Sequence, residues 1–341
     1  MKPDSAHSAS LWPHRLAIAL VCTTFPLLWV GGLVTTYKAG MAVPDWPTTY
    51  GYNMFLYPWN TWIAGPFDLF IEHGHRLLGA GVGMLTIALL AAIWRYDSRP
   101  GVRGLSVAAL AGVILQGSLG GMRVVLDRVT LAKIHGCVGP LFFALTVALA
   151  VVTSQWWKQQ RSEGRSSVDR TAERRLPRLA ILTVLVAYIQ LVLGAQLRHL
   201  PVGVSPSEFR AAVIMHVIFA VIVTVHVLLL ARRALSVRPR VESLARPAWI
   251  LMALVGGQLL LGLGAWISKY GWPQWLMPGD WLGEYTVQAE GFWPAMVTTA
   301  HVATGSLIIA LSLVIALRSV RMFGIGSSPA KQASAAWGTV A

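Results

Sequence analysis

Eight apolar runs of about twenty residues constrain this 341-residue chain more than any other feature of its sequence. A helix needs roughly 20 apolar residues to cross a bilayer core of about 30 Å. Lipid offers no hydrogen bonds, so the backbone polar groups must pair with one another, as they do in a helix. The runs lie at about 16–36, 75–94, 104–126, 131–153, 178–198, 211–232, 247–268 and 295–317. They predict an all-α polytopic membrane protein with eight transmembrane helices.

The composition agrees with a membrane protein, because 55% of the residues are hydrophobic and only 12% are charged. A net charge of +14 raises the question of a nucleic-acid partner. The basic residues, however, lie in short segments between apolar runs, where Lys and Arg orient helices in a bilayer. We therefore expect membrane lipid and no nucleic acid as a partner. Cys22 and Cys137 both fall inside apolar runs, which predicts neither a disulfide framework nor a CxxC metal site.

The distribution of positive charge predicts the orientation of the chain. If the N-terminus is inside, 20 of the 28 Lys and Arg residues fall in inner segments. The positive-inside rule then places both termini in the cytoplasm. We expect a multi-pass protein of a bacterial inner membrane.

A polar, Ser- and Arg-rich segment at 154–177 divides the predicted helices into two sets of four. We expect an N-terminal half at 1–157 with an outer loop at 37–71, a cytoplasmic linker at 158–177, and a C-terminal half at 178–341. Each half crosses the membrane an even number of times, so both enter in the same direction. Two parallel four-helix-bundle halves are therefore expected.

A short repeat supports this division. The pattern Q-x-x-L-G occurs at 116–120, 190–194 and 258–262, at similar depth in the third, fifth and seventh predicted helices. Its glutamines could contact a ligand directly. The more common role, which we favour, is that Gln forms hydrogen bonds between helices and Gly permits close packing.

Four of the nine histidines share one depth in the membrane. Each lies near the start of a helix that runs from outside to inside, namely His75, His135, His216 and His301. An ionisable side chain at membrane depth is costly unless it is paired or liganded. Two imidazoles that face each other across a bundle can hold an iron macrocycle from both sides. The alternative is an ordinary interhelical hydrogen bond for each, but the matched depth favours ligation.

Two further histidines are expected to have other roles. His226 lies deeper in the sixth helix, without a counterpart in the other helices, and is expected to be structural. His73 precedes His75 by two residues, so it projects from another side of the helix and is expected to be interfacial.

Glu72 lies three residues before His75, which places both side chains on one face of a helix. A carboxylate there can stabilise developing positive charge or accept a proton. The alternative is an interfacial carboxylate paired with Arg76. A di-iron bundle would need a second Glu-x-x-His motif and two further Glu, whereas this motif occurs once. Imidazoles without thiolates suit haem iron or copper better than structural zinc.

The predicted outer loop is rich in Pro, Gly and aromatic residues, which is typical of a compact cap. Its run AGMAVPDWP at 39–47, the stretch EHGHRLLG at 72–79, and the single predicted ligand in helices four, six and eight resemble the haem A synthase family of the inner membrane. The resemblance covers essentially the whole chain. Some members carry a cysteine pair in this loop and this chain does not, so no thiol-dependent step is implied.

The resemblance implies an oxidoreductase that converts the methyl group at position 8 of haem O into the formyl group of haem A, the cofactor of cytochrome c oxidases. It implies that His75 and His135 hold the substrate haem, with Glu72 as the essential carboxylate. It also implies a haem b cofactor between His216 and His301. Candidate partners are a haem O synthase, cytochrome c oxidase assembly factors and an electron acceptor that the sequence does not identify.

Haem propionates are anionic and need basic donors, for which Arg76 and Arg123 are the first candidates. Two other classes of function remain open. A dihaem cytochrome b-type protein would transfer electrons without modifying either haem, and it would have no need of Glu72. A transporter built from two parallel halves would carry short, interrupted helices, which the sequence does not indicate.

Overall fold

A computed structural model describes residues 10–162, 175–200, 203–237, 240–271 and 291–324. Within these ranges the chain is helical, with an isolated bridge between Thr49 and Tyr52 as its only β pairing. Eight of the described helices are long and apolar enough to cross a membrane. The predicted all-α membrane protein is therefore confirmed.

The first group of helices contains α1 (Trp12–Thr36), α3 (Phe67–Tyr96), α4 (Pro100–Val125) and α5 (Val129–Thr153). Between α1 and α3, the chain forms the short helices η1 (Ala39–Met41) and α2 (Trp59–Ile63). The second group contains α8 (Arg175–Arg198), α9 (Pro206–Ser236), α10 (Glu242–Tyr270) and α11 (Phe292–Phe323). Helix α6 (Gln155–Ser162) follows the first group directly, so the polar segment between the groups begins as a helix.

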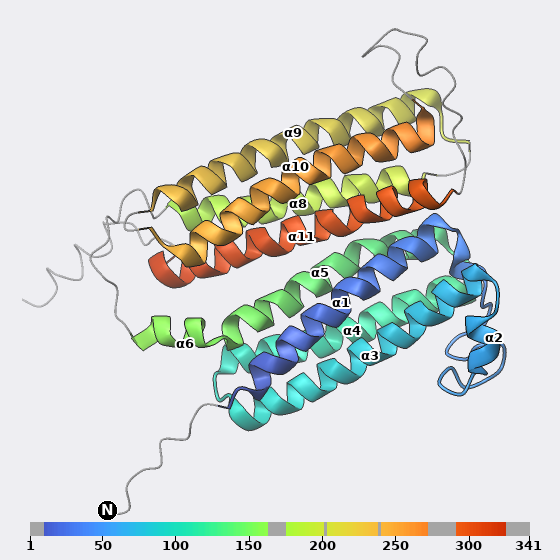
Figure 1. Cartoon of the computed structure of the whole chain (residues 1–341), viewed down its shortest axis with the longest axis horizontal. Coiled ribbons are helices and arrows are strands. Elements are labelled where there is room, and N and C mark those ends of the chain that lie inside the picture. The colour runs from blue at the N-terminus through green and yellow to red at the C-terminus, as the bar shows by residue number, and fades with distance from the viewer. Residues whose placement is uncertain (1–9, 163–174, 201–202, 238–239, 272–290, 325–341) are drawn as a thin grey trace, which may run out of the picture.

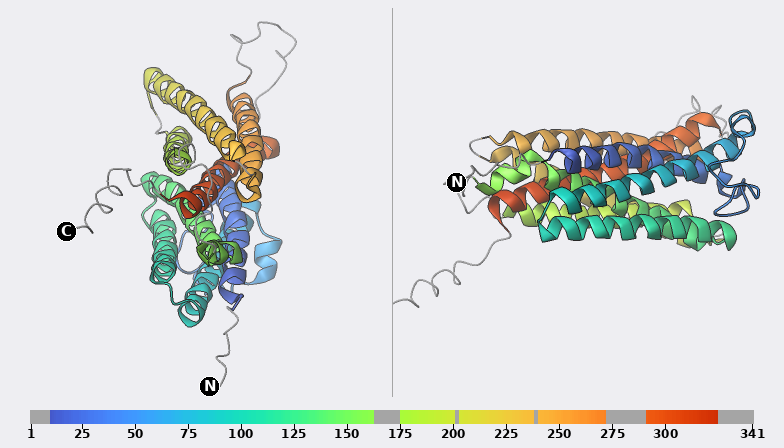
Figure 2. Two further views of the ribbon diagram at one scale, coloured as in Figure 1. Left: turned by 90° about the vertical axis from the view of Figure 1, so that its left-hand side faces the viewer. Right: turned by 90° about the horizontal axis from the view of Figure 1, so that it is seen from below.

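The two groups lie side by side, with their helices running along the same long axis (Figures 1 and 2). Within the groups, consecutive helices pack together: α1 with α3, α4 with α5, α8 with α9, and α10 with α11. The groups meet where α11 contacts α1 and α5, and where α8 contacts α5. The apolar windows of α5 and α11 are 67% and 50% buried, against 11–28% in the other six. These two helices therefore form the centre of the molecule.

Helix α3 begins at Phe67, whereas hydropathy predicts residue 75. The expected outer loop at 37–71 therefore ends at residue 66. Pro66 occupies the N-cap and Asp68 lies in the first turn, where a negative charge stabilises the helix dipole. The polar residues of this first part lower the local hydropathy, and contacts with the loop keep them in a helix. We refer to the end of the molecule that carries η1 and α2 as the loop end.

Contacts at the loop end also join the two groups. The Arg198 guanidinium of α8 donates hydrogen bonds to the Gly32 carbonyl oxygen, at 2.7 Å, and to the Thr36 hydroxyl of α1. The Thr36 hydroxyl lies 3.4 Å from that of Thr299 in α11. A Cβ atom added at Gly32 would lie 2.8 Å from the Thr299 methyl group, so glycine permits this close approach.

Candidate functional site

The four histidines of matched depth form two facing pairs. The ring centres of His75 in α3 and His135 in α5 lie 6.3 Å apart, with an angle of 82° between the ring planes. The ring centres of His216 in α9 and His301 in α11 lie 6.4 Å apart, with an angle of 65°. Each group of helices thus contains one pair with almost the same spacing.

This spacing fits two imidazoles that share one metal ion. With metal–nitrogen distances of about 2 Å and each ring centre roughly 1 Å farther, the two ring centres would lie about 6 Å apart. The Nδ1 atoms of His75, His135 and His301 are buried, and no described residue forms a hydrogen bond with them. The described residues form no group of three or more His, Cys, Asp or Glu around one point. Such a donor set suits a metal that brings its own equatorial ligands, as haem iron does.

Glycines allow each histidine ring to approach the preceding transmembrane helix. The glycine of each Q-x-x-L-G motif faces one histidine ring, and a Cβ atom added at that glycine would lie 3.0–3.2 Å from the ε1 carbon of the ring. The three contacts are Gly120 with His135, Gly194 with His216, and Gly262 with His301. At Gly31 in α1, the same atom would lie 2.8 Å from His75. All four rings therefore occupy space that a side chain would otherwise fill.

The glutamines of the motif contact the same histidines. The amide nitrogen of Gln116 donates to the His135 carbonyl oxygen at 3.2 Å, that of Gln190 lies 3.2 and 3.3 Å from the His216 ring nitrogens, and that of Gln258 lies 3.5 Å from His301 Nε2. These contacts support the interhelical role of the motif. In all three glutamines the amide oxygen is buried and has no hydrogen-bond partner among the described residues.

Glu72 is only 3% exposed and has partners on both carboxylate oxygens. Its Oε2 accepts a hydrogen bond from the Val43 backbone amide at 2.9 Å, and its Oε1 pairs with Arg76 at 2.9 Å. The sequence predicts the pairing with Arg76 as one of two roles for Glu72. The bond from Val43 ties the carboxylate to the loop, and no pattern in the sequence indicates it.

Arg76 anchors the same loop through its backbone. Besides Glu72, its guanidinium donates to the carbonyl oxygens of Val43, Asp45 and Thr48 at 2.7–3.0 Å. The terminal nitrogens of Arg76 are thus engaged by the loop, and its predicted contact with a propionate stays a prediction.

His73 is buried beneath the loop, and its expected position at the membrane interface stays a prediction. It is 1% exposed, and its Nδ1 lies 3.1 Å from the Thr49 hydroxyl. The rings of Tyr57 and Trp62 lie against it, with ring centres 5.2 and 5.3 Å away. The stretch 72–76 therefore serves two purposes. His75 faces His135, whereas the side chains of Glu72, His73 and Arg76 hold the loop.

Arg123, on α4, lies between the loop and the first histidine pair. Its guanidinium packs against Gly40 of η1, where a Cβ atom would overlap it. No described residue forms a hydrogen bond or an ion pair with it, although its charge acts on Glu72, His75 and His135. Arg123 is therefore a hydrogen-bond donor close to the pair.

A family model described as cytochrome oxidase assembly protein, COX15-CtaA, matches residues 14–211, which is more than half of the chain. This chain belongs to that family. It is similar to a heme A synthase of Shouchella clausii, with 28% identity over 200 residues, which are 57% of this chain and 62% of the relative. It is also 28% identical over 194 residues to a heme A synthase of Symbiobacterium thermophilum, covering 54% and 59% of the two chains. The chain thus matches about three fifths of the length of these relatives.

The family match covers the first histidine pair and Glu72 but ends before the second pair. His216 and His301 lie beyond residue 211, so their role does not follow from the family match. It rests on the geometry, because the second pair repeats the spacing and the glycine contacts of the first.

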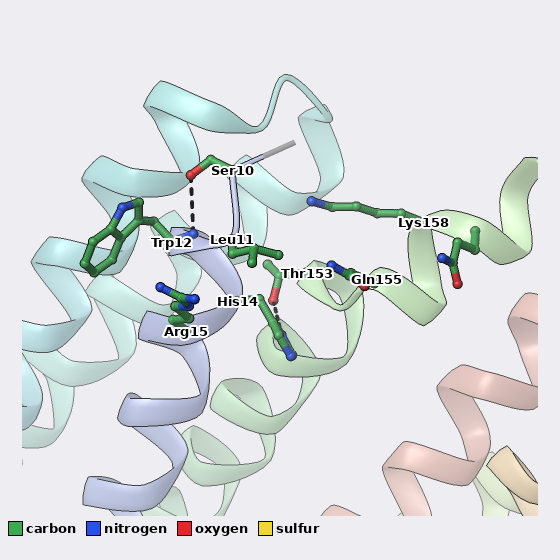
Figure 3. A pocket seen from close by; sticks show the side chains of 9 residues that line it. Ser10, Leu11, Trp12, His14, Arg15, Thr153, Gln155 and Lys158 are labelled. Carbon is green, nitrogen blue, oxygen red and sulfur yellow. Dashed lines mark hydrogen bonds between the residues drawn. The ribbon is translucent and has the colours of Figure 1, made fainter. Parts of the chain in front are cut away.

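A cavity of about 680 Å³ lies at the opposite end from the loop, between the start of α1 and the junction of α5 with α6 (Figure 3). His14, Arg15 and Lys158 are among its lining residues, and His14 Nδ1 lies 3.4 Å from the Thr153 hydroxyl. None of the predicted site residues lines it. The candidate site is therefore formed by the histidine pairs and not by this cavity.

Proposed function

We propose that this chain is a haem A synthase, which oxidises the C8 methyl group of haem O to a formyl group and so provides haem A for cytochrome c oxidase. The observation that carries the proposal is that each group of helices contains two facing histidines, whose ring centres lie 6.3 Å apart in the first group and 6.4 Å apart in the second. The family and the heme A synthases that the chain resembles support it.

In this proposal the two pairs have different roles. His75 and His135 hold the substrate haem O, because Glu72 lies one helical turn from His75 and no described acidic residue occupies the corresponding position beside His216 or His301. His216 and His301 hold a haem b cofactor, which supplies one-electron transfer when it is bound. Converting a methyl group into a formyl group adds one oxygen atom and removes electrons and protons, so an oxygen donor, either water or dioxygen, and an electron acceptor are also required.

Glu72 takes up a proton that leaves the substrate carbon. A carboxylate acts as a general base only when it is positioned near the reacting group, and the bonds from Val43 and Arg76 fix its position. Burial of this carboxylate also strengthens its effect on nearby developing charge. Arg123 binds a propionate, because its guanidinium has no hydrogen-bond partner among the described residues and Arg76 already has four acceptors.

We further propose that the chain lies in a bacterial inner membrane with both termini in the cytoplasm, as the positive charges of the inner segments favour. Residues 1–157 then form the substrate half, 158–177 the cytoplasmic linker, and 178–341 the haem b half. Haem O enters from the reaction that attaches its isoprenoid chain, which makes a haem O synthase a natural partner. The product passes to factors that assemble cytochrome c oxidase.

The test is to express the chain beside a haem O synthase in cells that make no haem A of their own. Extracted haems are separated by chromatography and identified by mass. We expect haem A to appear with the wild-type chain and not with an empty vector. If the purified protein holds two low-spin haems and the cells contain only haem O and haem b, the chain is a dihaem electron-transfer protein instead.

A further inference from the structure

The cavity at the end opposite the loop has a basic lining. Its volume of about 680 Å³ is within the range of pockets that hold small ligands. The lining residues come from the start of α1 and from the junction of α5 with α6, and they include His14, Arg15 and Lys158 but no Asp or Glu. A cavity with this lining favours an anionic ligand.

Two positive charges of this lining are not neutralised by the protein. Neither the Arg15 guanidinium nor the Lys158 ammonium forms a hydrogen bond or an ion pair with a described residue. The charge of Asp97 acts on Lys158, but the Asp97 carboxylate is engaged by Arg99, whose guanidinium donates to it at 2.6 and 2.9 Å. A phosphate group in the cavity would therefore meet two charged donors, which form strong hydrogen bonds with such an anion.

Contacts outside the basic residues hold the walls of the cavity in place. His14 Nδ1, on α1, lies 3.4 Å from the Thr153 hydroxyl, at the end of α5 (Figure 3). Helix α6 is held by α11, because the Arg321 guanidinium donates to the Trp157 carbonyl oxygen at 3.1 Å and lies over the Trp157 ring. From α6, the Lys158 side chain extends toward the start of α1 (Figure 3). The cavity is therefore built from three helices whose mutual positions do not depend on a ligand.

The position of the cavity favours a lipid over a soluble anion. Leu11 and Trp12 line it at the start of a membrane-spanning helix, and they are 41% and 56% exposed. Trp is typical of the membrane interface, where its ring lies among the lipid head groups. Basic pockets between helices on the cytoplasmic side are typical sites for anionic head groups. In the orientation that we propose, this end of the molecule is cytoplasmic.

We propose that this cavity binds the head group of an anionic phospholipid from the leaflet at this end of the molecule. Arg15 and Lys158 are the charged donors to its phosphate, and its acyl chains leave the cavity past Leu11 and Trp12. The bound lipid joins α1 to α6 and so stabilises this end of the first group of helices. Binding needs no haem, so the site is separate from the histidine pairs and does not rest on the proposed function.

Phosphatidylglycerol is the probe for the test, and phosphatidylcholine is its comparison, because it carries a phosphate but no net charge. Purified full-length protein in detergent is titrated with each lipid, and binding is followed by native mass spectrometry. We expect saturable binding of phosphatidylglycerol, about ten-fold tighter than that of phosphatidylcholine. Arg15→Gln and Lys158→Gln should each weaken it about five-fold, and the double variant about twenty-fold, since each basic residue contributes separately to the attraction.

The double variant Arg95→Gln with Arg232→Gln is the matched control. It removes the same two charges from exposed residues near the ends of α3 and α9, and neither residue lines the cavity. We expect it to retain the wild-type affinity for phosphatidylglycerol. The thermal midpoint without added lipid reports whether each variant has folded. If the double variant in the cavity does not fold, the comparison of Lys158→Gln with Lys158→Arg, which keeps the charge and should keep the binding, decides the question.

Equal affinities for the two lipids, or equal losses of affinity in the cavity variant and the control variant, overturn the inference. A competition with inorganic phosphate separates the two sources of the phosphate group. We expect an excess of inorganic phosphate to leave phosphatidylglycerol bound. Displacement of the lipid by an equal concentration of inorganic phosphate would show that the cavity takes a soluble anion, which also overturns the inference.

Discussion

The Val43 backbone amide donates a hydrogen bond of 2.9 Å to the Glu72 carboxylate, although 29 positions separate the two residues in the chain. Together with the bonds that Arg76 donates to the same loop, this contact joins the loop to the part of α3 that carries His75. The residue to which we assign proton transfer therefore also positions the loop. Substitutions at Glu72 must separate these two roles.

Glu72→Gln and Glu72→Ala separate them. The glutamine retains an oxygen that can accept the Val43 hydrogen bond but no longer carries a charge or takes up a proton. We expect both variants to lower the formation of haem A by about 100-fold or more, the usual contribution of a general base. The measurement is the amount of haem A extracted from cells that also make haem O.

The haem b content of the purified variants is the control, because the second histidine pair is remote from Glu72 and should stay filled. If Glu72→Gln made haem A at the wild-type rate while Glu72→Ala did not, Glu72 would act only by anchoring the loop. Extracts of Glu72→Ala that stay rich in haem A would reject both roles.

Replacing either member of the second pair tests the assignment of haem b. His216→Ala and His301→Ala each remove one axial ligand, so we expect the low-spin haem b spectrum to disappear from the purified protein. His226→Ala is the matched control, since His226 lies on the same helix as His216, ten positions further along. An unchanged spectrum in both His216→Ala and His301→Ala would show that other residues hold the cofactor.

Helix number and histidine depth could be predicted from the sequence, because both depend on local composition and on counting along a helix. The start of α3 could not. Asp68, Glu72 and Arg76 make that stretch too polar for a membrane span by hydropathy, and it becomes helical because partners from residues 43–49 satisfy its polar groups. Those partners belong to a loop whose path no local pattern specifies.

The Q-x-x-L-G motif also shows that a local pattern does not predict contacts between helices. Its repetition is visible in the sequence, but which histidine each glutamine meets depends on how the helices pair. The contact of His75 does not follow this motif, because the glycine that faces it, Gly31, has Leu27 and not a glutamine four positions before it. The contact becomes visible only in the folded arrangement of α1 and α3.

Arg198 should contribute to the stability of the contact between the two groups of helices. Arg198→Ala removes the hydrogen bonds to the Gly32 carbonyl and the Thr36 hydroxyl, and the loss of such charged donors costs about 1–3 kcal/mol of unfolding free energy. Thermal unfolding in detergent, followed by tryptophan fluorescence, should show a midpoint lower by several degrees. Arg210→Ala is the control, because Arg210 is exposed and its hydrogen bond among the described residues stays within its own helix. Equal midpoints for the two variants would contradict this role.

His199, next to Arg198, should make stability depend on pH. Burial lowers the pKa of His199 from its usual value to about 4, and the charges of Arg198, Arg123 and Lys133 add to this effect. Between pH 6.5 and 4, His199 therefore binds a proton in the unfolded chain but not in the folded protein. The free energy of unfolding falls as the pH decreases through this window, and above pH 6.5 His199 no longer makes it depend on pH. We expect the thermal midpoint to fall between pH 6.5 and 4.5 by more in the wild type than in His199→Gln. Identical pH profiles of the two proteins would mean that His199 titrates alike in the folded and unfolded chains.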